Sequence, residues 1–358
     1  MLFSLFILNS LLLALAMANF ATIRKPNNSA VNDASVTVLL PVRNEAENID
    51  RILLELKNQI NLPNLSILVI DDNSEDETFQ LAKQHTSPRI SVIQAPSLAD
   101  GWIGKVAALQ AGYRHLGSSA PDVIVSIDAD VHFEVDAISR AVNSLDSTEL
   151  DFISPYPRQI ANSWGERLIQ PLLQWSWMST VLLRGAEKIP MTSTVICNWQ
   201  FLVMRGSSLK TIGGFETVAH KVLDDIELGR SFVSAGFKGA VISGSEISST
   251  RMYQNFSEIR AGYGKSLHLA FGSIVGSAIA ALFVGATALL PFFSALGGNL
   301  LGLAALLAII GTRIVSAAAS GTRIRDAFLH PISAALFIYL LYFSWSNRGK
   351  TQWKGRTL

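Results

Sequence analysis

Residues 1–23 and residues 266–312 of this 358-residue chain contain no Asp, Glu, Lys or Arg. Apolar segments of about 20 residues are long enough to cross the hydrocarbon core of a bilayer as helices. We therefore predict a membrane anchor over residues 1–23 and three further spans, at 271–293, 299–318 and 327–345. The alternative for the N-terminus is a secretory signal, but no positively charged side chain precedes its apolar run.

The distribution of charge predicts on which side of the membrane the rest of the chain lies. Charged residues make up 16% of the chain, against about 25% in soluble domains. Arg24 and Lys25 follow the first apolar segment, which favours a cytoplasmic location for what comes next. Three spans after a cytoplasmic domain would leave the basic tail outside. Either 299–318 is therefore partly re-entrant or the tail is an exception, and we favour a cytoplasmic tail.

The charge balance also bears on possible partners. Residues 269–358 hold seven Lys or Arg and one acid, so the remainder has 22 bases and 27 acids. A mildly acidic domain joined to a basic membrane part offers no basic surface for nucleic acid.

From Val36 onward, short apolar runs alternate with helical stretches, the pattern of an α/β domain with a mostly parallel sheet. Strands are predicted at 36–40, 66–70, 90–93 and 123–127. Pro41 is expected to end the first strand. Helices are expected from Asn44 to about residue 59 and from Lys105 onward.

Charged residues follow the ends of these strands. Asp128 and Asp130 come directly after 123–127, and ligands of open α/β sheets bind beyond the carboxyl ends of the strands. Two carboxylates there form a hard-oxygen pocket suited to Mg²⁺ or Mn²⁺, with an ordinary acidic turn as the alternative. The other strand ends carry Arg43 with Glu45, Asp71 with Asp72, and Lys105 after the glycines at 101 and 104. The set predicts a nucleoside-diphosphate site, although no P-loop and no G-x-G-x-x-G is present.

The ordered series of motifs resembles one family. Between Val36 and Thr250 the chain reads PVRNE, VIDDNSEDET, GWIGKVAALQAG, SIDAD, IGGFE and LDDIELGRSFVSAG. This series is similar to the family 2 glycosyltransferases of GT-A fold. Its finer details, GWIGK, RMYQ and a terminal QWKGR, resemble the integral-membrane branch associated with carotenoid and hopanoid glycosylation. The resemblance implies a Rossmann-like α/β domain with a mostly parallel sheet, between N-terminal and C-terminal transmembrane helices.

The resemblance also implies a role for each matching residue. The segments that hold the nucleoside correspond to Pro41, Arg43, Glu45, Asp71 and Asp72. Lys105 corresponds to a basic residue near the ribose and phosphates. Asp128 and Asp130 correspond to the D-x-D motif, which binds the divalent cation that clamps the donor diphosphate. Asp225 corresponds to the catalytic base of an inverting reaction; because Asp224 stands where the family has Glu, either acid of the pair is a candidate.

The chemistry explains why an acid is needed at this point. An acceptor hydroxyl must lose a proton as it attacks the sugar, and a positioned carboxylate is a natural general base. A helix is predicted over 226–235, so N–H groups at its start would hold Asp225 ionised. The alternative for Asp224 is an N-cap.

Two segments are candidates for contacts with the acceptor. Residues 164–183 are apolar and rich in Trp, which favours a helix lying at the membrane interface with Trp164, Trp175 and Trp177 at headgroup level. A plain buried helix is the alternative. Further along, Trp199 and Gln200 either line an acceptor pocket or serve the structure, and His220 is a candidate neighbour of the base.

A basic segment follows the domain. Arg251, Arg260 and Lys265 either close over the diphosphate as a gating loop or anchor to anionic lipid heads. The Q-x-x-R-W motif of processive synthases is absent after Gln254, which favours the addition of one sugar or few.

These features predict a multi-pass enzyme of the cell (inner) membrane with a cytoplasmic catalytic domain. It would be an inverting hexosyltransferase that moves a sugar from a UDP- or GDP-linked donor to a lipid-type acceptor, such as a carotenoid or hopanoid hydroxyl. The alternatives are a polyprenyl-phosphate glycosyltransferase, a short polysaccharide synthase, or an inactive membrane scaffold or sugar-nucleotide sensor. The predicted parts are an anchor (1–23), a GT-A domain (36–250), a juxtamembrane segment (251–268), membrane helices (269–346) and a basic tail (347–358).

Overall fold

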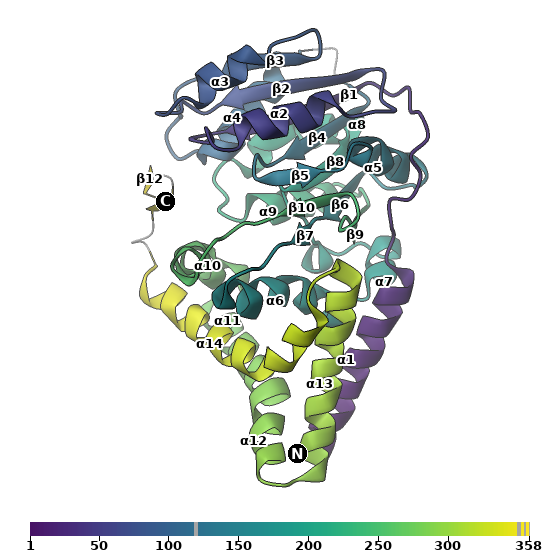
Figure 1. Ribbon diagram of the computed structural model, residues 1–358, viewed down its shortest axis with the longest axis vertical. Helices are drawn as coiled ribbons and strands as arrows, with labels where there is room; N and C mark the ends of the chain where they lie inside the picture. Colours follow the sequence, from purple (N-terminus) through teal and green to yellow (C-terminus); the bar gives the residue numbers. More distant parts are fainter. Residues whose placement is uncertain (118–120, 349–351, 354–355, 358) are drawn as a thin grey trace. The chain divides into compact units, whose positions relative to one another are not determined.

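A seven-stranded mixed sheet lies at the centre of one of the two units into which the computed structural model divides (Figure 1). The structure describes residues 1–117, 121–348, 352–353 and 356–357. The sheet unit consists of Arg24–Arg158 and Gly185–Thr250. The helical unit consists of Met1–Ile23, Gln159–Arg184 and Arg251–Leu358.

The strands of the sheet follow the order β3-β2-β1-β4-β8-β6-β9. They are β1 (Val36–Val42), β2 (Leu65–Asp71), β3 (Ile90–Gln94), β4 (Val123–Ile127), β6 (Phe152–Tyr156), β8 (Phe201–Arg205) and β9 (Gly239–Ser243). Only β8 runs antiparallel to its neighbours, so the predicted α/β class with a mostly parallel sheet is confirmed. β4 has the predicted bounds, and all of its residues are buried, as in a strand covered on both faces.

Pro41 lies inside β1 and does not end it, contrary to the prediction. The carbonyl of Val42 accepts a hydrogen bond from the Asp72 N–H on the β2 side, so Pro41 faces the opposite side. There the pairing of β1 with β4 has already stopped at Leu39. A proline without an N–H is tolerated at this position because it faces an unpaired edge.

Helices cover both faces of the sheet. They are α2 (Ile49–Lys57), α3 (Thr78–Gln84), α4 (Gly104–His115), α5 (Ala137–Asp146), α8 (Gly206–Thr211) and α9 (Asp224–Ser234), with short turns η1 (Thr192–Thr194) and η2 (Gly214–Val218). α7 (Leu183–Lys188) joins residues of the two units. One hydrophobic core contains residues of α2 and α5, and a second contains residues of α4 and α9. α2 begins later than predicted because Asn44 adopts a left-handed φ of 52°.

A small second sheet lies beside the end of β4. Its strands β5 (Val131–Phe133), β10 (Ser248–Thr250) and β7 (Arg158–Gln159) follow the order β5-β10-β7. Thr250 pairs with Val131, which brings the end of β10 next to Asp130. Near the C-terminus β11 (Gln352–Trp353) pairs with β12 (Arg356–Thr357). Residues 349–351, 354–355 and 358 of the predicted tail, including part of QWKGR, lie outside the described residues.

The helical unit is built from long apolar helices. They are α1 (Leu2–Thr22), α6 (Trp164–Thr180), α10 (Phe256–Ala270), α11 (Ile274–Val284), α12 (Leu290–Leu296), α13 (Leu300–Ser320) and α14 (His330–Ser346), with a π-helical turn η3 (Gly285–Leu289) and a 3-10 turn η4 (Ile324–Leu329). α1 packs along α13, α10 packs against α14, and α6 contacts α1, α13 and α14.

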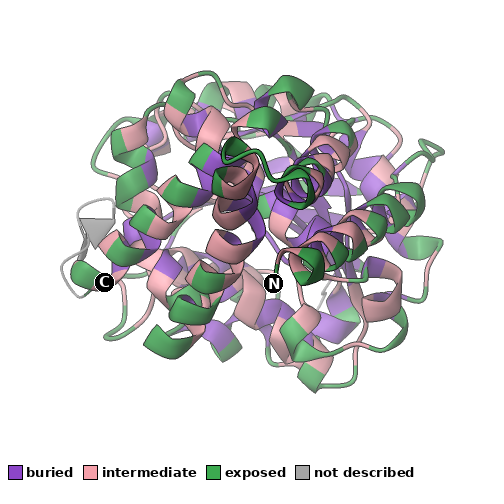
Figure 2. Cartoon of the chain, turned by 90° about the horizontal axis from the view of Figure 1, so that it is seen from below, coloured by how far each residue is buried: buried purple, intermediate pink, exposed green. Residues whose placement is uncertain are grey.

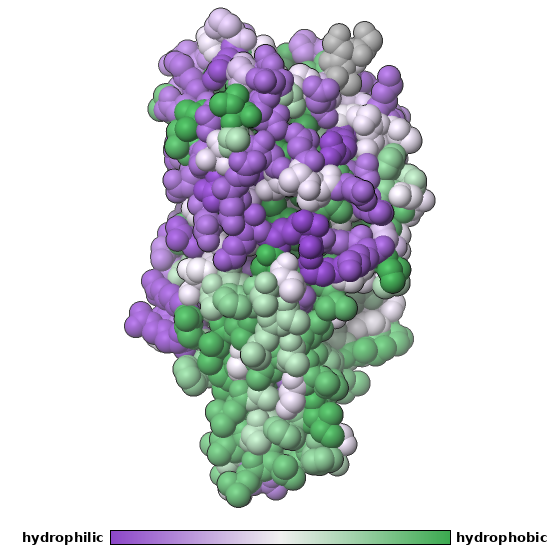
Figure 3. All heavy atoms as spheres, turned by 90° about the vertical axis from the view of Figure 1, so that its right-hand side faces the viewer, coloured by the Kyte–Doolittle hydropathy of each residue, from purple (hydrophilic) through white to green (hydrophobic). Residues whose placement is uncertain are grey.

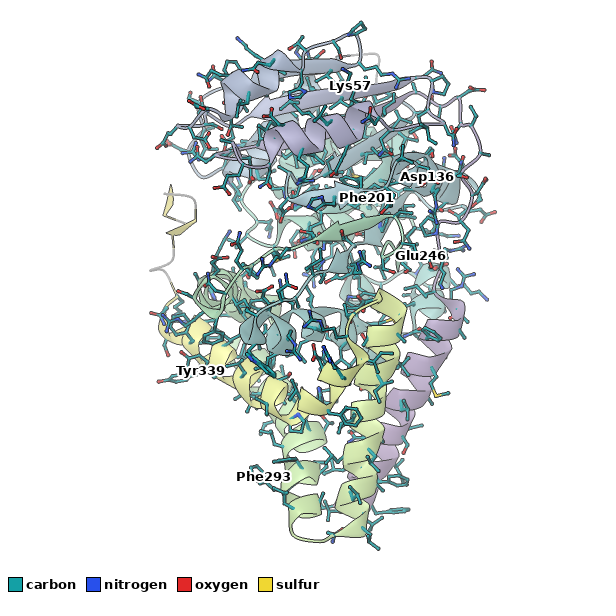
Figure 4. The ribbon with its side chains drawn as sticks, in the orientation of Figure 1. Lys57, Asp136, Phe201, Glu246, Phe293 and Tyr339 are labelled. Atoms are coloured by element: carbon teal, nitrogen blue, oxygen red, sulfur yellow. The ribbon has the colours of Figure 1, made fainter. Side chains whose placement is uncertain are left out.

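Four segments of this unit are long and apolar enough to cross a membrane: Leu2–Thr22, Ile274–Leu296, Leu300–Ser320 and Ile324–Ser346. Figure 3 shows hydrophobic residues over the surface of the long helices. The side chains of Phe293 and Tyr339 point outward from α12 and α14 (Figure 4). Few residues of α1 are buried, and the helices seen in Figure 2 present many exposed residues. The unit is therefore suited to a membrane, as the sequence predicts.

The tryptophans of α6 differ from the prediction. Trp164 is exposed, whereas Trp175 and Trp177 are buried inside the helical unit. Trp175 donates from Nε1 to the Thr312 hydroxyl at 2.7 Å. Trp175 and Trp177 therefore fit the alternative of a buried helix, because α6 packs against α1, α10, α13 and α14.

Candidate active site

The carboxyl ends of β1, β2 and β4 meet at one edge of the sheet because these strands are parallel neighbours. Asp128 follows β4 directly, and Lys105 lies in the first turn of α4. The Lys105 ammonium and the Asp128 carboxylate form a short ion pair. Their side chains keep 18% and 27% of their surface exposed, so the pair remains accessible to a ligand.

Lys105 is the cation of a cluster of acids. Burial lowers the pKa of Lys105, but the carboxylates of Asp128, Asp224 and Asp225 outweigh this effect and the pKa is raised. The Lys105 Nζ also lies 5.7 Å from the centroid of the Trp199 ring. One charged amine thus interacts with acids from β4 and from α9, elements nearly a hundred residues apart in the sequence.

Asp224 and Asp225 form the start of α9. The Ile226 N–H donates to Asp225 Oδ1 at 2.8 Å, and the Asp225 N–H donates to Asp224 Oδ1 at 3.1 Å. Burial and then the charge of Asp224 raise the pKa of Asp225 to about 7, against the opposite effects of the Ile226 N–H and Lys105. The helix N-terminus holds Asp225 through the Ile226 N–H, as predicted, but burial and the charge of Asp224 outweigh its effect on the pKa. A pKa near 7 suits a general base at neutral pH.

Asp130 lies in the turn between β4 and β5. It accepts a hydrogen bond from the Thr250 hydroxyl at 3.3 Å. Burial, followed by the charges of Asp128 and Glu45, raises the pKa of Asp130 to about 6, although Lys105 and Thr250 lower it. The two carboxylates of this turn therefore repel each other, and Lys105 lies within electrostatic reach of both.

This turn fits a divalent cation. Asp128 and Asp130 offer hard oxygen ligands, and a cation would relieve the repulsion that raises the pKa of Asp130. Within the described residues, no three His, Cys, Asp or Glu side chains come together in a geometry that could hold a metal. Two carboxylates without a third protein ligand match Mg²⁺ or Mn²⁺ whose coordination is completed by water and substrate phosphates.

Comparison with known proteins identifies the family. The model of "Glycosyl transferase family 2" matches residues 37–213, which include β4, the Asp128 turn and all of β1 except Val36. The chain belongs to glycosyltransferase family 2. Two curated relatives are 4,4'-diaponeurosporenoate glycosyltransferases of Staphylococcus aureus. The protein of strain MRSA252 is 24% identical over 260 residues, 70% of this chain and 65% of the relative. That of strain USA300 is 24% identical over 251 residues, 68% of this chain and 62% of the relative.

The chain thus spans slightly less than two thirds of the length of those relatives. Among solved structures, it resembles a mannosyltransferase from Pyrobaculum calidifontis in complex with GDP-Man and Mn²⁺. The TM-score is 0.52 at 17% identity, covering 97% of this chain and 98% of that protein. The likeness confirms the GT-A-like fold.

Arg43, one of the predicted nucleoside-binding residues, holds two strand ends together. Arg43 donates from Nη1 to the carbonyls of Asp72 and Asn73, at 2.7 and 2.8 Å, and from Nη2 to Glu75 at 2.9 Å. This arginine therefore joins the end of β1 to the end of β2. Pro41 lies inside β1, one residue before its end.

The acids of this region are deeply placed. Asp71 is fully buried, and one of its oxygens accepts from the Ser74 N–H at 3.1 Å. Its Oδ1 has no hydrogen-bond partner among the described residues, so it is able to accept another hydrogen bond. Asp72 is 4% exposed, and Glu45 accepts from the Asn48 amide at 2.8 Å. The assignment of these residues to a nucleoside stays a prediction.

Trp199 and Gln200 are buried, with 4% and 3% of their surface exposed. The Asn198 side chain donates to Gln200 Oε1 at 2.9 Å and accepts from the Gln200 N–H at 2.6 Å. Trp199 packs against Phe215 and lies under Lys105. Trp199 is therefore part of the charged site, whereas Gln200 is held by its neighbour Asn198.

The basic residues after the sheet unit belong to the helical unit. Arg251 pairs with Glu166 at 3.0 Å, and the Arg260 guanidinium lies 5.2 Å from the centroid of the Phe343 ring. Lys265 is half-buried in α10. Contacts of these three residues with a diphosphate or with lipid heads stay predictions.

Three residues connect to the site in ways that the sequence pattern did not specify. Tyr156, at the end of β6, is buried, and burial followed by the charge of Asp225 raises its pKa. Thr250 donates to Asp130, which only its pairing opposite Val131 explains. His220 donates from Nδ1 to the Gly101 carbonyl at 2.6 Å, so it joins the segment before α9 to the turn before α4. Short motifs identify none of these contacts because each depends on strand pairing or on two distant loops.

Proposed function

We propose that this family 2 glycosyltransferase moves a hexosyl group from a nucleotide-sugar donor to a lipid-type acceptor, with inversion at the anomeric carbon. The observation that supports the proposal is the position of Asp225. Its carboxylate, with a pKa of about 7, interacts electrostatically with both Lys105 and Asp128. A base poised to ionise at neutral pH and a cationic phosphate site therefore occur in one cluster.

The donor half of the reaction uses the strand ends. The diphosphate of a UDP- or GDP-linked sugar would contact the Lys105 ammonium, and the nucleoside would lie against Arg43, Asp71 and Asp72. Mg²⁺ or Mn²⁺ bound by Asp128 and Asp130 would supply Lewis-acid neutralisation of the leaving diphosphate. The mannosyltransferase that shares this fold was solved with GDP-Man and Mn²⁺, which is consistent with the donor class.

The transfer half uses α9. Asp225 accepts the proton of the acceptor hydroxyl as that oxygen forms a bond to the anomeric carbon. The bond from this carbon to the diphosphate oxygen breaks, and the nucleoside diphosphate leaves with the electron pair. Lys105 stabilises the negative charge that develops on the leaving group. Asp224 raises the pKa of Asp225 and accepts its N–H, so we assign the base role to Asp225.

A lipid-type acceptor is supported by the helical unit. Four of its segments are apolar enough to span a bilayer, so an acceptor dissolved in the membrane need not leave it. The relatives are named for 4,4'-diaponeurosporenoate, which favours a carotenoid-type acceptor. Arg24 and Lys25, which follow α1, favour a sheet unit on the cytoplasmic side of the cell membrane. The basic residues of 251–268 would then meet either the diphosphate or anionic headgroups.

The test is transfer by the full-length protein in detergent, with UDP- and GDP-sugars and a lipid extract from a deletion strain, followed by mass spectrometry of the products. Asp225→Asn should keep donor affinity and lose about 10²–10⁴-fold in turnover. Asp224→Asn is the matched control and should retain more activity. Full activity of Asp225→Asn would reject the assignment of the base. A wild-type protein that binds donor but transfers to no lipid would support a scaffold or sensor instead.

A further inference from the structure

The helical unit contains a buried positive charge without a hydrogen-bonded acid. Arg313 lies in α13, well inside the helix, and only 3% of its surface is exposed. Its Nε–H has no hydrogen-bond partner among the described residues. Taking a guanidinium out of water is strongly unfavourable unless an opposite charge compensates it. Within a membrane-spanning segment the same requirement is more severe.

The acids of this unit are engaged elsewhere. Its sequence segments contain three of them: Glu166, Glu258 and Asp326. Asp326 accepts a hydrogen bond from the Arg167 Nε at 2.9 Å and a second, short one from the same guanidinium. Arg313 lies within electrostatic reach of Asp326 but makes no ion pair with it in the described part of the chain. Asp326 therefore neutralises Arg167, and the positive charge of Arg313 is left without an ion-pair partner among the described residues.

Two other polar side chains of this unit are buried without a partner among the described residues, and one of them lies near Arg313. His330 is fully buried and within electrostatic reach of Arg313, and neither of its ring nitrogens has a partner among the described residues. Ser333, three residues later on the same face of α14, is also fully buried with an unpartnered hydroxyl. The Trp175 ring lies edge-on to His330, with centroids 4.7 Å apart. We call Arg313, His330 and Ser333 the donor cluster.

We propose that the donor cluster binds an oxyanion, a carboxylate or a phosphate ester, carried by an amphiphile. An oxyanion accepts several hydrogen bonds at once and pairs best with a guanidinium. Water would satisfy His330 and Ser333 but would leave the charge of Arg313 uncompensated. α13 and the η4–α14 segment are both apolar enough to span a membrane, so a ligand that reaches them from the bilayer carries an apolar tail. All three residues belong to the helical unit, and the proposal does not depend on the proposed transfer.

The experiment measures thermal unfolding of the full-length protein in a neutral detergent with four probes. Oleate and oleoyl lysophosphatidic acid carry an oxyanion on an apolar chain, oleyl alcohol has the chain without the charge, and inorganic phosphate has the charge without the chain. We expect the two anionic amphiphiles to raise the unfolding temperature by several degrees, and the other two probes to have no effect. A shift in the unfolding temperature with inorganic phosphate alone would support the binding of an oxyanion but would overturn the requirement for an apolar chain. An equal shift with oleyl alcohol would overturn the oxyanion.

Variants then locate the effect. Arg313→Gln should abolish the shift with both amphiphiles and raise the unfolding temperature of the ligand-free protein, because an uncompensated charge is removed. Arg325→Gln removes an exposed arginine of the same unit and should leave the shift unchanged. Should Arg313→Gln fail to fold, the double variant His330→Asn, Ser333→Ala should still weaken anion binding about tenfold. An undiminished shift in a folded Arg313→Gln variant, or in the double variant, would overturn the proposal.

Discussion

The two units carry buried charge of opposite sign. In the sheet unit, four acids lie within electrostatic reach of Lys105: Asp128, Asp130, Asp224 and Asp225; Glu45 lies within reach of Asp130. In the helical unit, Arg313 has no carboxylate of its own and Asp326 is paired with Arg167. Solvated surfaces carry either sign at little cost, but a buried excess is unfavourable unless a ligand of opposite charge neutralises it. The comparison indicates the charge of the ligand for each unit: a cation for the acids and an anion for the arginine.

Removal of one acid is the strongest test of the first half of this comparison. Asp128→Asn and Asp130→Asn keep the shape of each side chain and remove its charge, so each should weaken metal-dependent donor binding by about 10²–10³-fold. Isothermal titration of UDP and GDP with and without Mn²⁺ measures the effect. Asp33→Asn, at an exposed position, is the control and should bind as the wild type does. Wild-type affinity for UDP or GDP in either site variant would contradict the binding of a cation by these acids. The same conclusion would follow if Mn²⁺ did not change the affinity of the wild type.

A satisfied ion pair in the helical unit provides the contrast to Arg313. Glu166 is buried, pairs with Arg251 and accepts the N–H groups of Asn162 and Ser163. Burial raises its pKa, but the hydrogen bonds from Arg251 and Ser163 outweigh this and lower the pKa to about 2. Glu166→Gln should therefore reduce the free energy of unfolding by roughly 2 kcal/mol at pH 7.

The contribution of the Glu166 ion pair to the free energy of unfolding should depend on pH. Because the pKa of Glu166 is depressed, its contribution is fully present above the ordinary value near 4.5 and is lost as the pH falls towards 2. Thermal unfolding of the detergent-solubilised protein at pH 7 and pH 3 measures it, with the exposed Glu258→Gln as control. Equal stability of Glu166→Gln and wild type at pH 7 would mean that the pair contributes nothing.

Much of the sheet unit was predictable because its signals are local. β4 has the predicted bounds since a short run of buried β-branched residues ends directly in Asp128. Arg43, Asp72 and Asp128 lie at one edge because the parallel neighbours β1, β2 and β4 end there, a rule that needs no side-chain detail. The start of α2 was missed because a left-handed Asn44 delays it, and the length of β1 because Pro41 faces an edge that only the pairing of distant strands defines.

The energetic features were the least predictable part. A helix N-terminus at Asp225 was evident, but the raised pKa depends on burial, which only the folded site provides. In the same way, Trp175 reads as an interfacial residue until the packing of α6 buries it. The uncompensated charge of Arg313 depends on the engagement of Asp326 by Arg167, a pairing across 159 residues. Composition indicates the excess of each sign, and long-range contacts decide which charges remain unpaired.

The pH–rate profile sharpens the account of the acid cluster. As a base, Asp225 acts when deprotonated, so kcat/KM should fall about tenfold per pH unit below about pH 7 and level off above it. The free energy of unfolding should change with pH in the opposite direction to kcat/KM. With the pKa raised from 3.8 to about 7, the folded state holds the proton more tightly, so stability falls as the pH rises through that range. In the Asp225→Asn variant this loss of stability with rising pH should be absent. Thermal unfolding measured from pH 5 to 8 tests this. A flat rate profile over the same range would contradict the assignment.

The smallest expected effect comes from an uncharged contact beside the cluster. His220 donates to the Gly101 carbonyl, and the Ile103 N–H donates to the Ala219 carbonyl at 2.9 Å, so two hydrogen bonds join the loop before Lys105 to the loop before α9. Gly101 has a φ of 77°, and a Cβ there would lie 3.3 Å from the His220 ring, so the turn closely fits this side chain. His220→Ala should raise the KM for donor about fivefold, equivalent to roughly 1 kcal/mol, with kcat nearly unchanged.

His220→Asn places an amide donor near the position of Nδ1 and should restore the wild-type KM, while His115→Ala, at an exposed site on α4, should have no effect. The midpoint of the pH–rate profile is the more informative measurement. Since His220 holds a loop and is not among the groups that shift the pKa of Asp225, that midpoint should stay near pH 7 in His220→Ala. A shifted midpoint would mean that the loop contact also sets the burial of the acids. In that case the pKa of Asp225 would depend on the packing of this loop as well as on the neighbouring charges.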